Sequence, residues 1–353
     1  MPETATPVRL ADLTTLRVGG PVARLVDVDS EADLVAAVRT ADAAGEPLLV
    51  LGGGSNLLVS DAGFDGVAVR DVRRSIHVED ASACAGVSLT AVAGQPWDDV
   101  VVRAVTEGWV GVEALSGIPG STGATPVQNV GAYGQQVSDT VATVRVWDRE
   151  QNRVRTLAWG DLAFGYRSSL LKRSLEGAGP TPRYVVLDVT FQLRFGTLSA
   201  PLRYGELARR LDVEVGQRAP LADVREAVLE LRRGKGMVLD PADRDTWSAG
   251  SFFTNPMLDT ADAGRIPPGA PRYVSEGRVK TSAAWLIEQA GFGKGYGLPG
   301  PAALSGKHTL AITNRGDATA QDLVRLAREV RDGVRDTFGI TLEPEPVLVG
   351  CAL

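Results

Sequence analysis

Two glycine-rich segments of this chain have the composition of loops that bind a ligand through the backbone. In the first, Gly52, Gly53 and Gly54 follow the apolar run PLLVL and precede Ser55 and Asn56. Glycines let a backbone approach a ligand closely, and successive N–H groups can bind an anion such as pyrophosphate. A tight turn between two strands explains this segment equally well. Its spacing also departs from the dinucleotide fingerprint G-x-G-x-x-G, because a leucine occupies the position of the last glycine.

The second segment, SGIPGSTGATPVQNVGAYG at 116–134, is more specific. It lies in a loop at 115–135 that is too long for a passive connection in a compact domain, and two prolines stiffen it. An Ω-loop packed on itself is the alternative. Two glycine loops together suit a large, two-ended cofactor such as a dinucleotide. The candidate contact residues in this second loop are Ser116, Gly117, Ile118, Pro119, Gly120, Ser121, Ala124, Thr125, Gln128, Asn129, Gly131, Ala132, Tyr133 and Gly134.

The scarcity of cysteine and histidine limits the chemistry that the chain can perform with its own side chains. Two cysteines, Cys84 and Cys351, cannot form a disulfide framework or a four-thiolate metal site. His77 and His308 lie far apart, and no G-x-S-x-G motif accompanies His308 to suggest a serine hydrolase. We therefore expect a bound cofactor and oxygen-bearing side chains to carry the chemistry, without a metal.

Length and charge narrow the class of protein further. The 353 residues predict two to three domains at roughly 150 residues each. A formal net charge of −6 argues against nonspecific nucleic-acid binding, which needs a basic surface. No apolar stretch approaches the 18 or more residues of a membrane span, and no signal-peptide pattern opens the chain, so we expect a cytoplasmic protein.

Alternating strands and helices must position the glycine loops. A strand at 21–28 precedes a helix that Ser30 caps and that ends at Gly45, and the apolar run at 47–59 contains the first glycine loop. A helix at 97–108 precedes the second glycine loop. Further strands are predicted at 141–147, 153–158 and 183–195.

Three further helices and a strand are predicted towards the end of the chain. Helices are expected at 221–236, 282–295 and 317–339, the last with Asp317 as its N-cap and Gly339 at its end, before a final strand at 340–350. The whole pattern indicates an α+β protein with several mixed sheets rather than one doubly wound sheet.

Taken in order, the motifs resemble those of one enzyme family. LGGGSNLLVSD at 51–61, together with the second glycine loop, is similar to the flavin-binding half of UDP-N-acetylenolpyruvoylglucosamine reductases, the MurB family of peptidoglycan synthesis. FGYRSSLLK, LRRGKGMVLDP, AGSFFTNP, AAWLIEQAG and LEPEPVLVG follow in family order, so the resemblance runs from about residue 14 to residue 350. LRYGEL at 202–207 resembles the segment with a substrate-side tyrosine in the type I branch.

The resemblance implies a fold and a domain organisation. It implies a two-lobed FAD-binding fold of the PCMH or vanillyl-alcohol-oxidase type, followed by a C-terminal α/β substrate-binding domain. The expected boundaries are 1–72 for the first FAD subdomain, completed by the strand at 340–353, then 73–216 for the second and 217–339 for the substrate domain.

The resemblance also implies a reaction with two halves. NADPH reduces bound FAD, which then passes a hydride to the enolpyruvyl ether of UDP-N-acetylglucosamine enolpyruvate, giving UDP-N-acetylmuramate. This product serves peptidoglycan synthesis, and through it cell wall biogenesis, cell shape and cell division. The implied partners are these two small molecules, without nucleic acid or membrane, and the protein is expected to be a monomer.

Three residues match the catalytic positions of the family. Arg167 in FGYR would bind the substrate carboxylate through its guanidinium. A surface ion pair is the alternative for any arginine in this arginine-rich chain, but the neighbouring Tyr166 and the pair Ser168–Ser169 favour the functional role. Ser251 in AGSFF would donate the proton; its alternative is a turn or capping residue. Glu345 in LEPE would hold a proton beside the substrate carboxylate. Glu343 is the alternative carboxylate, and Pro346 departs from the family pattern by removing a strand donor.

The remaining matches concern the substrate. Lys235 is one of only five lysines and matches a family lysine near the diphosphate, although a cation at a helix C-terminus is its alternative role. The predicted substrate-binding residues are Tyr166, Tyr204, Lys235, Asn255, Tyr273 and His308. Two other functions fit part of the pattern: a flavin-dependent oxidase or dehydrogenase of the same fold, and a nucleotide-sugar-binding protein without redox activity.

Overall fold

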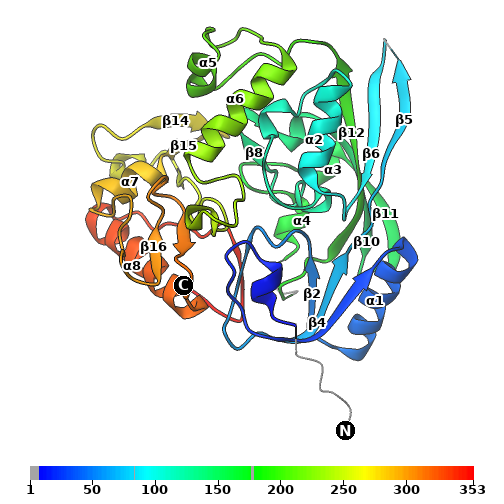
Figure 1. Cartoon of the computed structure of the whole chain (residues 1–353), viewed down its shortest axis with the longest axis horizontal. Helices are drawn as coiled ribbons and strands as arrows, with labels where there is room; N and C mark the ends of the chain where they lie inside the picture. The colour runs from blue at the N-terminus through cyan, green and yellow to red at the C-terminus, as the bar shows by residue number, and fades with distance from the viewer. Residues whose placement is uncertain (1–7, 83, 176–178) are drawn as a thin grey trace. The chain divides into compact units, whose positions relative to one another are not determined.

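The computed structural model describes residues 8–82, 84–175 and 179–353, and the chain divides into two compact units (Figure 1). The sheet unit combines Arg24–Gly53 with Asp65–Gly234. The C-terminal unit combines the residues up to Ala23 with Gly54–Phe64 and Lys235–Leu353. Residues 217–234 group with the sheet unit, and the boundaries of the three expected lobes stay a prediction.

A small sheet with the strand order β1-β4-β2 carries the first helix. Its elements are β1 (Val22–Val28), α1 (Glu31–Ala44), β2 (Leu48–Leu51) and β4 (Phe64–Asp71). The Oγ of Ser30 accepts a hydrogen bond from the N–H of Asp33 at 3.0 Å, and Gly45 ends the helix with a φ of 64°. Both predicted ends of α1 are therefore confirmed, and its apolar face packs against β2 and β4.

A larger antiparallel sheet forms the centre of the sheet unit, with the strand order β11-β10-β12-β6-β5. Its strands are β5 (Ile76–Ser82), β6 (Gly86–Val92), β10 (Val141–Asp148), β11 (Arg153–Ala158) and β12 (Tyr184–Phe195), and β7 (Trp109–Val110) pairs with the end of β12. Helix α2 (Trp97–Thr106) covers this sheet, and Trp97 meets Phe191 of β12 with ring centroids 5.6 Å apart. The strands and the helix predicted in this region are confirmed.

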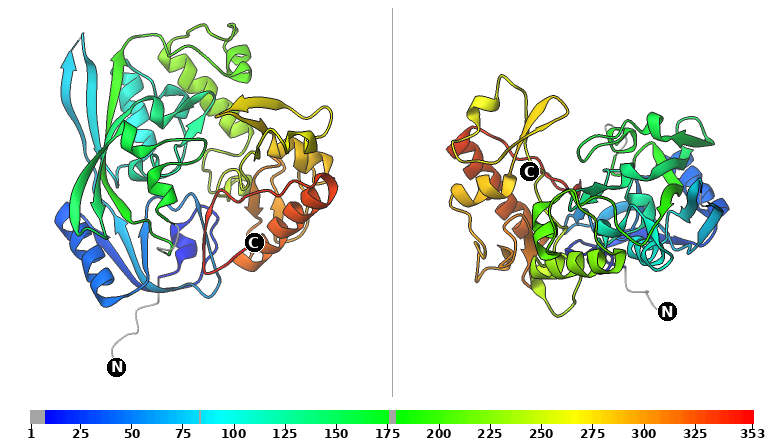
Figure 2. Two further views of the ribbon diagram at one scale, coloured as in Figure 1. Left: turned by 180° about the vertical axis from the view of Figure 1, so that it is seen from behind. Right: turned by 90° about the horizontal axis from the view of Figure 1, so that it is seen from above.

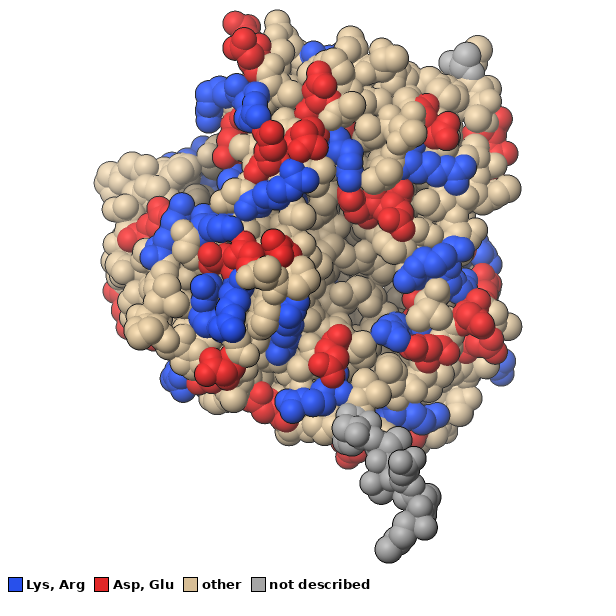
Figure 3. Space-filling view, in the orientation of Figure 1, with Lys and Arg blue, Asp and Glu red and all other residues tan. Residues whose placement is uncertain are grey.

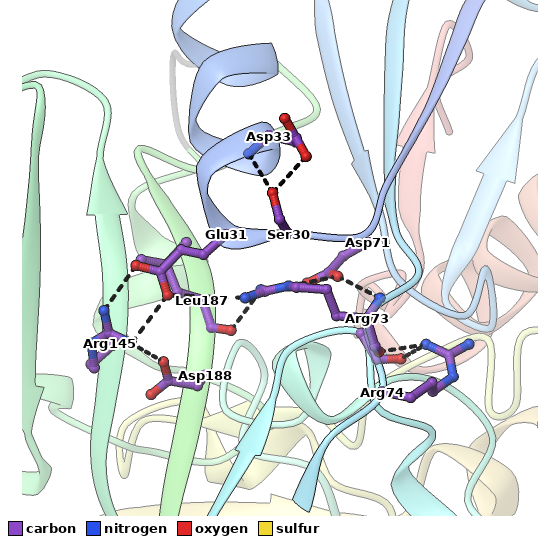
Figure 4. A network of polar contacts seen from close by, with 10 residues as sticks. Ser30, Glu31, Asp33, Asp71, Arg73, Arg74, Arg145, Leu187 and Asp188 are labelled. Carbon is purple, nitrogen blue, oxygen red and sulfur yellow. Dashed lines mark hydrogen bonds and ion pairs between the residues drawn. The ribbon is translucent and has the colours of Figure 1, made fainter.

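An ion-pair network joins the N-terminus of α1 to the larger sheet (Figure 4). Arg145 of β10 donates to Glu31 at 2.9 Å and also pairs with Asp188 of β12. Arg73, which follows β4, donates to the carbonyl oxygen of Leu187 in β12 at 2.9 Å. Burial raises the pKa of Asp188. The two sheets of this unit are therefore joined by charged side chains as well as by the apolar cluster between them.

Short elements complete the sheet unit. The second glycine loop contains a 3-10 turn at Thr122–Ala124 and the short strand β8 (Gly131–Ala132). Directly after the loop, β9 (Gln135–Gln136) pairs with β8 in a small hairpin, and a further 3-10 turn follows at Val137–Asp139. The other helices are α3 (Trp159–Leu162), α4 (Leu170–Arg173), α5 (Gly205–Arg210) and α6 (Leu221–Gly234). The helix predicted at 221–236 is thus confirmed as α6.

The C-terminal unit contains the last strand of the chain, which pairs with an early one. β3 (Leu57–Val59) runs parallel to β18 (Val347–Val349) in a sheet of these two strands, and the expected completion of the first FAD subdomain by the last strand stays a prediction. Its other strands are β13 (Met257–Leu258), β14 (Arg272–Ser275), β15 (Arg278–Thr281), β16 (Ala302–Leu304) and β17 (Ile312–Asn314). Its core lies around α7 (Ala283–Gln289) and α8 (Ala320–Phe338), which pack side by side (Figure 2).

The start of α8 differs from the prediction. Thr319, not Asp317, is its N-cap: the Oγ1 of Thr319 accepts from the N–H of Asp322 at 3.1 Å, and the Asp322 carboxylate accepts from the N–H of Thr319 at 3.0 Å. The carboxylate of Asp61 accepts from the next two N–H groups, those of Ala320 at 2.7 Å and Gln321 at 3.1 Å. These acceptors bind the free N–H groups of the first turn, so the helix begins two residues later than predicted. Gly339 ends the helix as predicted.

Candidate functional site

The two glycine loops touch each other at positions that leave no room for a side chain. A Cβ atom built on Gly53 would lie 2.6 Å from the Cα of Gly120, and one on Gly52 would lie 2.7 Å from the Oγ of Ser121. Carbon atoms in ordinary contact are about 3.5–4.0 Å apart, so glycine at position 53 is what permits this approach. The fold thus brings together two segments that are predicted from the sequence to bind one ligand.

The second glycine loop is held against the segment that precedes α2. The N–H of Thr122 donates to the carbonyl of Gln95 at 2.7 Å, and the N–H of Trp97 donates to the carbonyl of Gly120 at 3.0 Å. A Cβ atom on Gly123 would lie 2.5 Å from the Cβ of Ala93. The loop is therefore a packed structure with a defined backbone rather than a linker.

Asp98 anchors the beginning of this loop. Its Oδ1 accepts from the N–H of Gly117 at 2.7 Å, and its two oxygens accept from Arg225 of α6 at 2.8 Å each. Burial acts to raise the pKa of Asp98, but the bonds from Arg225 and Gly117 outweigh burial and hold the pKa below its usual value. This pair could not be predicted from the sequence. Its members are 127 positions apart, and acidic residues in the first turn of a helix are common.

Residues 54–56 of the first glycine loop belong to the C-terminal unit and are tied to its last strand. Gly54 has a φ of 64°, and a Cβ atom there would lie 1.8 Å from the carbonyl oxygen of Leu13. The Nδ2 of Asn56 donates to the carbonyl of Glu345 at 3.3 Å, and the carbonyl of Asn56 accepts from the N–H of Val347 at 3.0 Å. A predicted cofactor contact therefore lies beside a predicted catalytic residue.

Arg167 lies in a tight turn that holds it in an uncommon backbone conformation. Gly165 and Ser168 exchange backbone hydrogen bonds of 3.0 and 3.2 Å, and Arg167 between them has a φ of 50°. A non-glycine residue in this region costs about 1–3 kcal/mol, and such strain clusters at functional sites. The Nη2 of Arg167 donates to the carbonyl of Gly131 at 3.0 Å, and its guanidinium carbon lies 5.9 Å from the Tyr166 ring centroid. The turn thus places Arg167 beside the second glycine loop.

Backbone pairing brings Ser251 and Glu345 close together within the C-terminal unit. Phe253 and Pro344 form an antiparallel bridge, and the N–H of Glu345 donates to the carbonyl of Phe252 at 2.9 Å. Phe252 therefore stands opposite Glu345, and Ser251 is its neighbour in the chain. The two predicted catalytic residues of this unit share one short stretch of paired backbone.

The same pairing separates Glu345 from the alternative carboxylate. The N–H of Thr254 donates to the carbonyl of Glu343 at 3.0 Å, so Glu343 stands opposite Thr254, which is further along the chain from Ser251 than Phe252 is. Pro346 removes no pairing, because the N–H groups of Glu345 and Val347 on either side of it are both bonded. This arrangement favours Glu345 over Glu343 as the partner of Ser251.

Tyr204 contacts the second glycine loop from the residue that precedes α5. Its ring meets the Tyr133 ring edge-on, with centroids 5.4 Å apart and an interplanar angle of 88°. Burial raises the pKa of Tyr133 to about 12, so this phenol stays protonated at neutral pH and can donate a hydrogen bond. Tyr204 is 43% exposed and thus has a surface that a ligand can contact.

The other predicted substrate residues are distributed over the C-terminal unit. Lys235 directly follows α6, and Tyr273 lies on β14. The Oδ1 of Asn255 accepts from the N–H of Ala283 in the first turn of α7 at 2.9 Å. His308 lies in the turn between β16 and β17. Their contacts with a substrate stay a prediction.

Two further properties concern the described part of the chain. No group of histidine, cysteine, aspartate or glutamate side chains within it is arranged to hold a metal ion. None of its helices is long and apolar enough to cross a membrane. On the face shown in Figure 3, basic and acidic side chains are interspersed rather than gathered by sign.

Comparison with known families defines the class of protein. A model of FAD-binding domains matches residues 22–157, and a model of the C-terminal domain of UDP-N-acetylenolpyruvoylglucosamine reductase matches residues 240–349. The fold and its glycine loops are therefore those of an FAD-dependent oxidoreductase with a second, family-specific domain. The predicted fold class and the predicted FAD cofactor are confirmed.

Individual relatives identify the family. The UDP-N-acetylenolpyruvoylglucosamine reductase of Cutibacterium acnes is 55% identical over 349 residues, which cover 98% of this chain and 90% of that protein. That of Saccharopolyspora erythraea is 57% identical over 356 residues, covering 98% and 95%. The crystal structure of the Thermus caldophilus enzyme (MurB) superposes with a TM-score of 0.65 and 26% identity over 98% of both chains. The chain belongs to the UDP-N-acetylenolpyruvoylglucosamine reductase family, as its motifs predicted.

Proposed function

We propose that this protein reduces UDP-N-acetylglucosamine enolpyruvate to UDP-N-acetylmuramate, with NADPH as the reductant and bound FAD as the cofactor. The activity is that of its family and belongs to peptidoglycan precursor synthesis. The observation that carries the proposal is the contact between Gly53 and Gly120, which joins two glycine loops within an FAD-binding domain. We expect the protein to act as a cytoplasmic monomer.

The glycine loops fit a dinucleotide. At Gly53 a Cβ atom would collide with the backbone of the second loop, and at Gly52 with the side chain of Ser121, so both positions of the first loop need glycine for this approach. Backbone N–H groups of residues 52–56 and 116–134 would bind the pyrophosphate and the flavin ring system. When bound, FAD supplies hydride transfer between NADPH and the substrate.

Arg167 is proposed to bind the substrate carboxylate. Its planar guanidinium can donate two parallel hydrogen bonds to a carboxylate and keeps its charge throughout catalysis. Addition of hydride to the terminal vinyl carbon places negative charge on the carbon next to that carboxylate. The fixed turn at Gly165–Ser168 holds the guanidinium in advance, so that it stabilises this charge without first having to reorganise.

Ser251 is proposed to donate a proton to the carbon that bears the carboxylate. A serine hydroxyl is a weak acid, but an enediolate carbon is basic enough to accept its proton. Glu345, which stands opposite Phe252, is proposed to hold a proton beside the substrate carboxylate and to hydrogen-bond the developing enediolate. Substrate recognition is assigned to Tyr166, Tyr204, Lys235, Asn255, Tyr273 and His308.

Ser251→Ala tests this assignment of roles. In anaerobic stopped-flow experiments, NADPH should bleach the flavin of the variant at the rate of the wild type. Reoxidation by the enolpyruvyl sugar should slow by about 100-fold or more, the usual effect of removing a proton donor. Equal slowing of both half-reactions would assign the defect to flavin binding or folding. A colourless protein that cannot be reconstituted with FAD would refute the proposed function itself.

A further inference from the structure

We propose that Asn129 is a positioning residue that fixes the guanidinium of Arg167, an inference that rests on the proposed role of Arg167 in substrate binding. Asn129 is one of the residues predicted from the sequence to contact the cofactor. In the structure, its carboxamide instead bonds to protein groups on three sides, and its backbone carbonyl contacts Arg167.

The carboxamide of Asn129 uses both of its donor hydrogens within the protein. Nδ2 donates to the Oε1 of Gln136 at 3.1 Å and to the carbonyl oxygen of Gly165 at 3.1 Å. Oδ1 accepts from the N–H of Ser138 at 3.1 Å. The side chain is nearly buried, with 2% of its residue surface exposed. An amide has two donor hydrogens, so no hydrogen of this group remains for a ligand.

These bonds form a closed ring of contacts that passes through Asn129, Gly165 and Arg167. Asn129 binds the carbonyl of Gly165, the first residue of the turn that carries Arg167. The Nη1 of Arg167 donates back to the carbonyl oxygen of Asn129 at 3.4 Å, and Nη2 donates to the carbonyl of Gly131 at 3.0 Å. The same asparagine therefore holds both the backbone before Arg167 and one of the acceptors that orient its guanidinium.

The backbone conformation of Asn129 explains why an asparagine stands here. Its φ is 47°, in the left-handed region that few residues other than glycine and asparagine adopt readily. Glycine would keep the backbone but lose all three side-chain bonds. Aspartate would keep the acceptor for Ser138 but place an anionic oxygen against the carbonyl of Gly165. Asn129→Gly and Asn129→Asp therefore both break the ring of contacts, while the backbone can keep its positive φ.

The experiment measures both half-reactions in the FAD-loaded enzyme for Asn129→Asp and Asn129→Gly. Reduction by NADPH should stay within about twofold of the wild type. Reoxidation by the enolpyruvyl sugar should slow by about 10- to 100-fold, because a misplacement of about 1 Å can cost about 100-fold in rate. Calorimetric titration of the oxidised enzyme with UDP-N-acetylmuramate gives a readout without turnover, and its dissociation constant should rise by a similar factor.

Asn152 provides the matched control. It has a φ of 52° and lies exposed in the turn between β10 and β11. Asn152→Asp and Asn152→Gly make the same chemical changes at the same backbone angle, and both half-reactions should stay at the wild-type rate. Gln136→Ala removes one exposed partner of Asn129 and tests the inference even where Asn129 variants do not fold. It should slow reoxidation alone, by about 2- to 10-fold, the effect of one neutral hydrogen bond.

A double-mutant cycle with Arg167→Lys separates positioning from structural damage. If Asn129 acts through the guanidinium, Asn129→Gly should slow reoxidation little further in the Arg167→Lys background. Full additivity, or weakened FAD binding with equal loss in both half-reactions, would overturn the positioning role. If Arg167→Lys alone leaves reoxidation unchanged, the proposed function of Arg167 fails first, and the two failures are distinguishable.

Discussion

Gly53→Ala tests whether the contact between the glycine loops builds the FAD site. The new Cβ atom would lie 2.6 Å from the Cα of Gly120 and 3.0 Å from its carbonyl carbon. Both neighbours are backbone atoms, so no side chain can rotate away to make room. Reaching a normal carbon–carbon separation of about 3.5–4.0 Å requires the two loops to part by about 1 Å. Alanine itself is acceptable at position 53, because this residue has no positive φ.

The expected magnitude follows from this displacement. Inserting one carbon atom into a packed region costs about 1–3 kcal/mol, which corresponds to FAD binding that is about 5- to 150-fold weaker. The assay is titration of the apoprotein with FAD, followed by the quenching of flavin fluorescence. The unfolding temperature of the apoprotein should fall only slightly, because without FAD the two loops are free to move apart.

Gly160→Ala is the control. Gly160 lies in α3, and a Cβ atom there would meet nothing within 4 Å. Alanine has a higher helix propensity than glycine, so this variant should be at least as stable as the wild type. It should also bind FAD normally, because its new Cβ atom meets nothing. Wild-type FAD affinity in Gly53→Ala would refute the view that this contact builds the cofactor site.

Two further predictions concern stability. Asp148 is fully buried, and although burial acts to raise its pKa, hydrogen bonds led by those of Arg183 lower the pKa to about 2. The contribution of the Asp148 carboxylate to the free energy of unfolding is therefore fully present above the unfolded-state pKa of about 3.9 and is lost as the pH falls through about 2. Asp148→Asn should thus lower the free energy of unfolding, measured with urea at pH 7, by about 2 kcal/mol. The difference from the wild type should shrink below about pH 4, and a difference that is constant down to pH 2 would contradict this assignment. Thr319→Ala should lower the free energy of unfolding by about 1 kcal/mol through the lost N-cap, whereas Asp317→Ala should change it by less than about 0.5 kcal/mol; equal losses would contradict the observed start of α8.

Local sequence signals predicted the elements whose ends depend on neighbouring residues. Ser30 and Gly45 bound α1 through contacts within the helix itself, so both ends could be read from the sequence. The start of α8 could not be predicted in this way. Asp317 and Thr319 are both good capping residues, and the choice depends on Asp61, which is 259 positions away from its first partner in α8.

The candidate site was predictable as a set of residues but not as a set of contacts. The glycine loops and Arg167 stand out by composition and motif. That Gly53 meets Gly120, and that Asp98 binds Arg225, depends on how distant segments fold together. Asn129 shows the same limit: the bond from its carboxamide to the carbonyl of Gly165, in the turn that carries Arg167, joins residues 36 positions apart.

The pairing of β3 with β18 has a consequence for how the chain matures. Asn56 and Glu345, which join these strands, are separated by 289 positions. At about 5–20 residues per second, a ribosome needs about 15–60 s to synthesise the chain between them. Throughout that time β3 has emerged while its partner strand does not yet exist. The C-terminal unit can therefore reach its final structure only after synthesis is almost complete, and any truncation before residue 347 leaves β3 without the strand that it pairs with here.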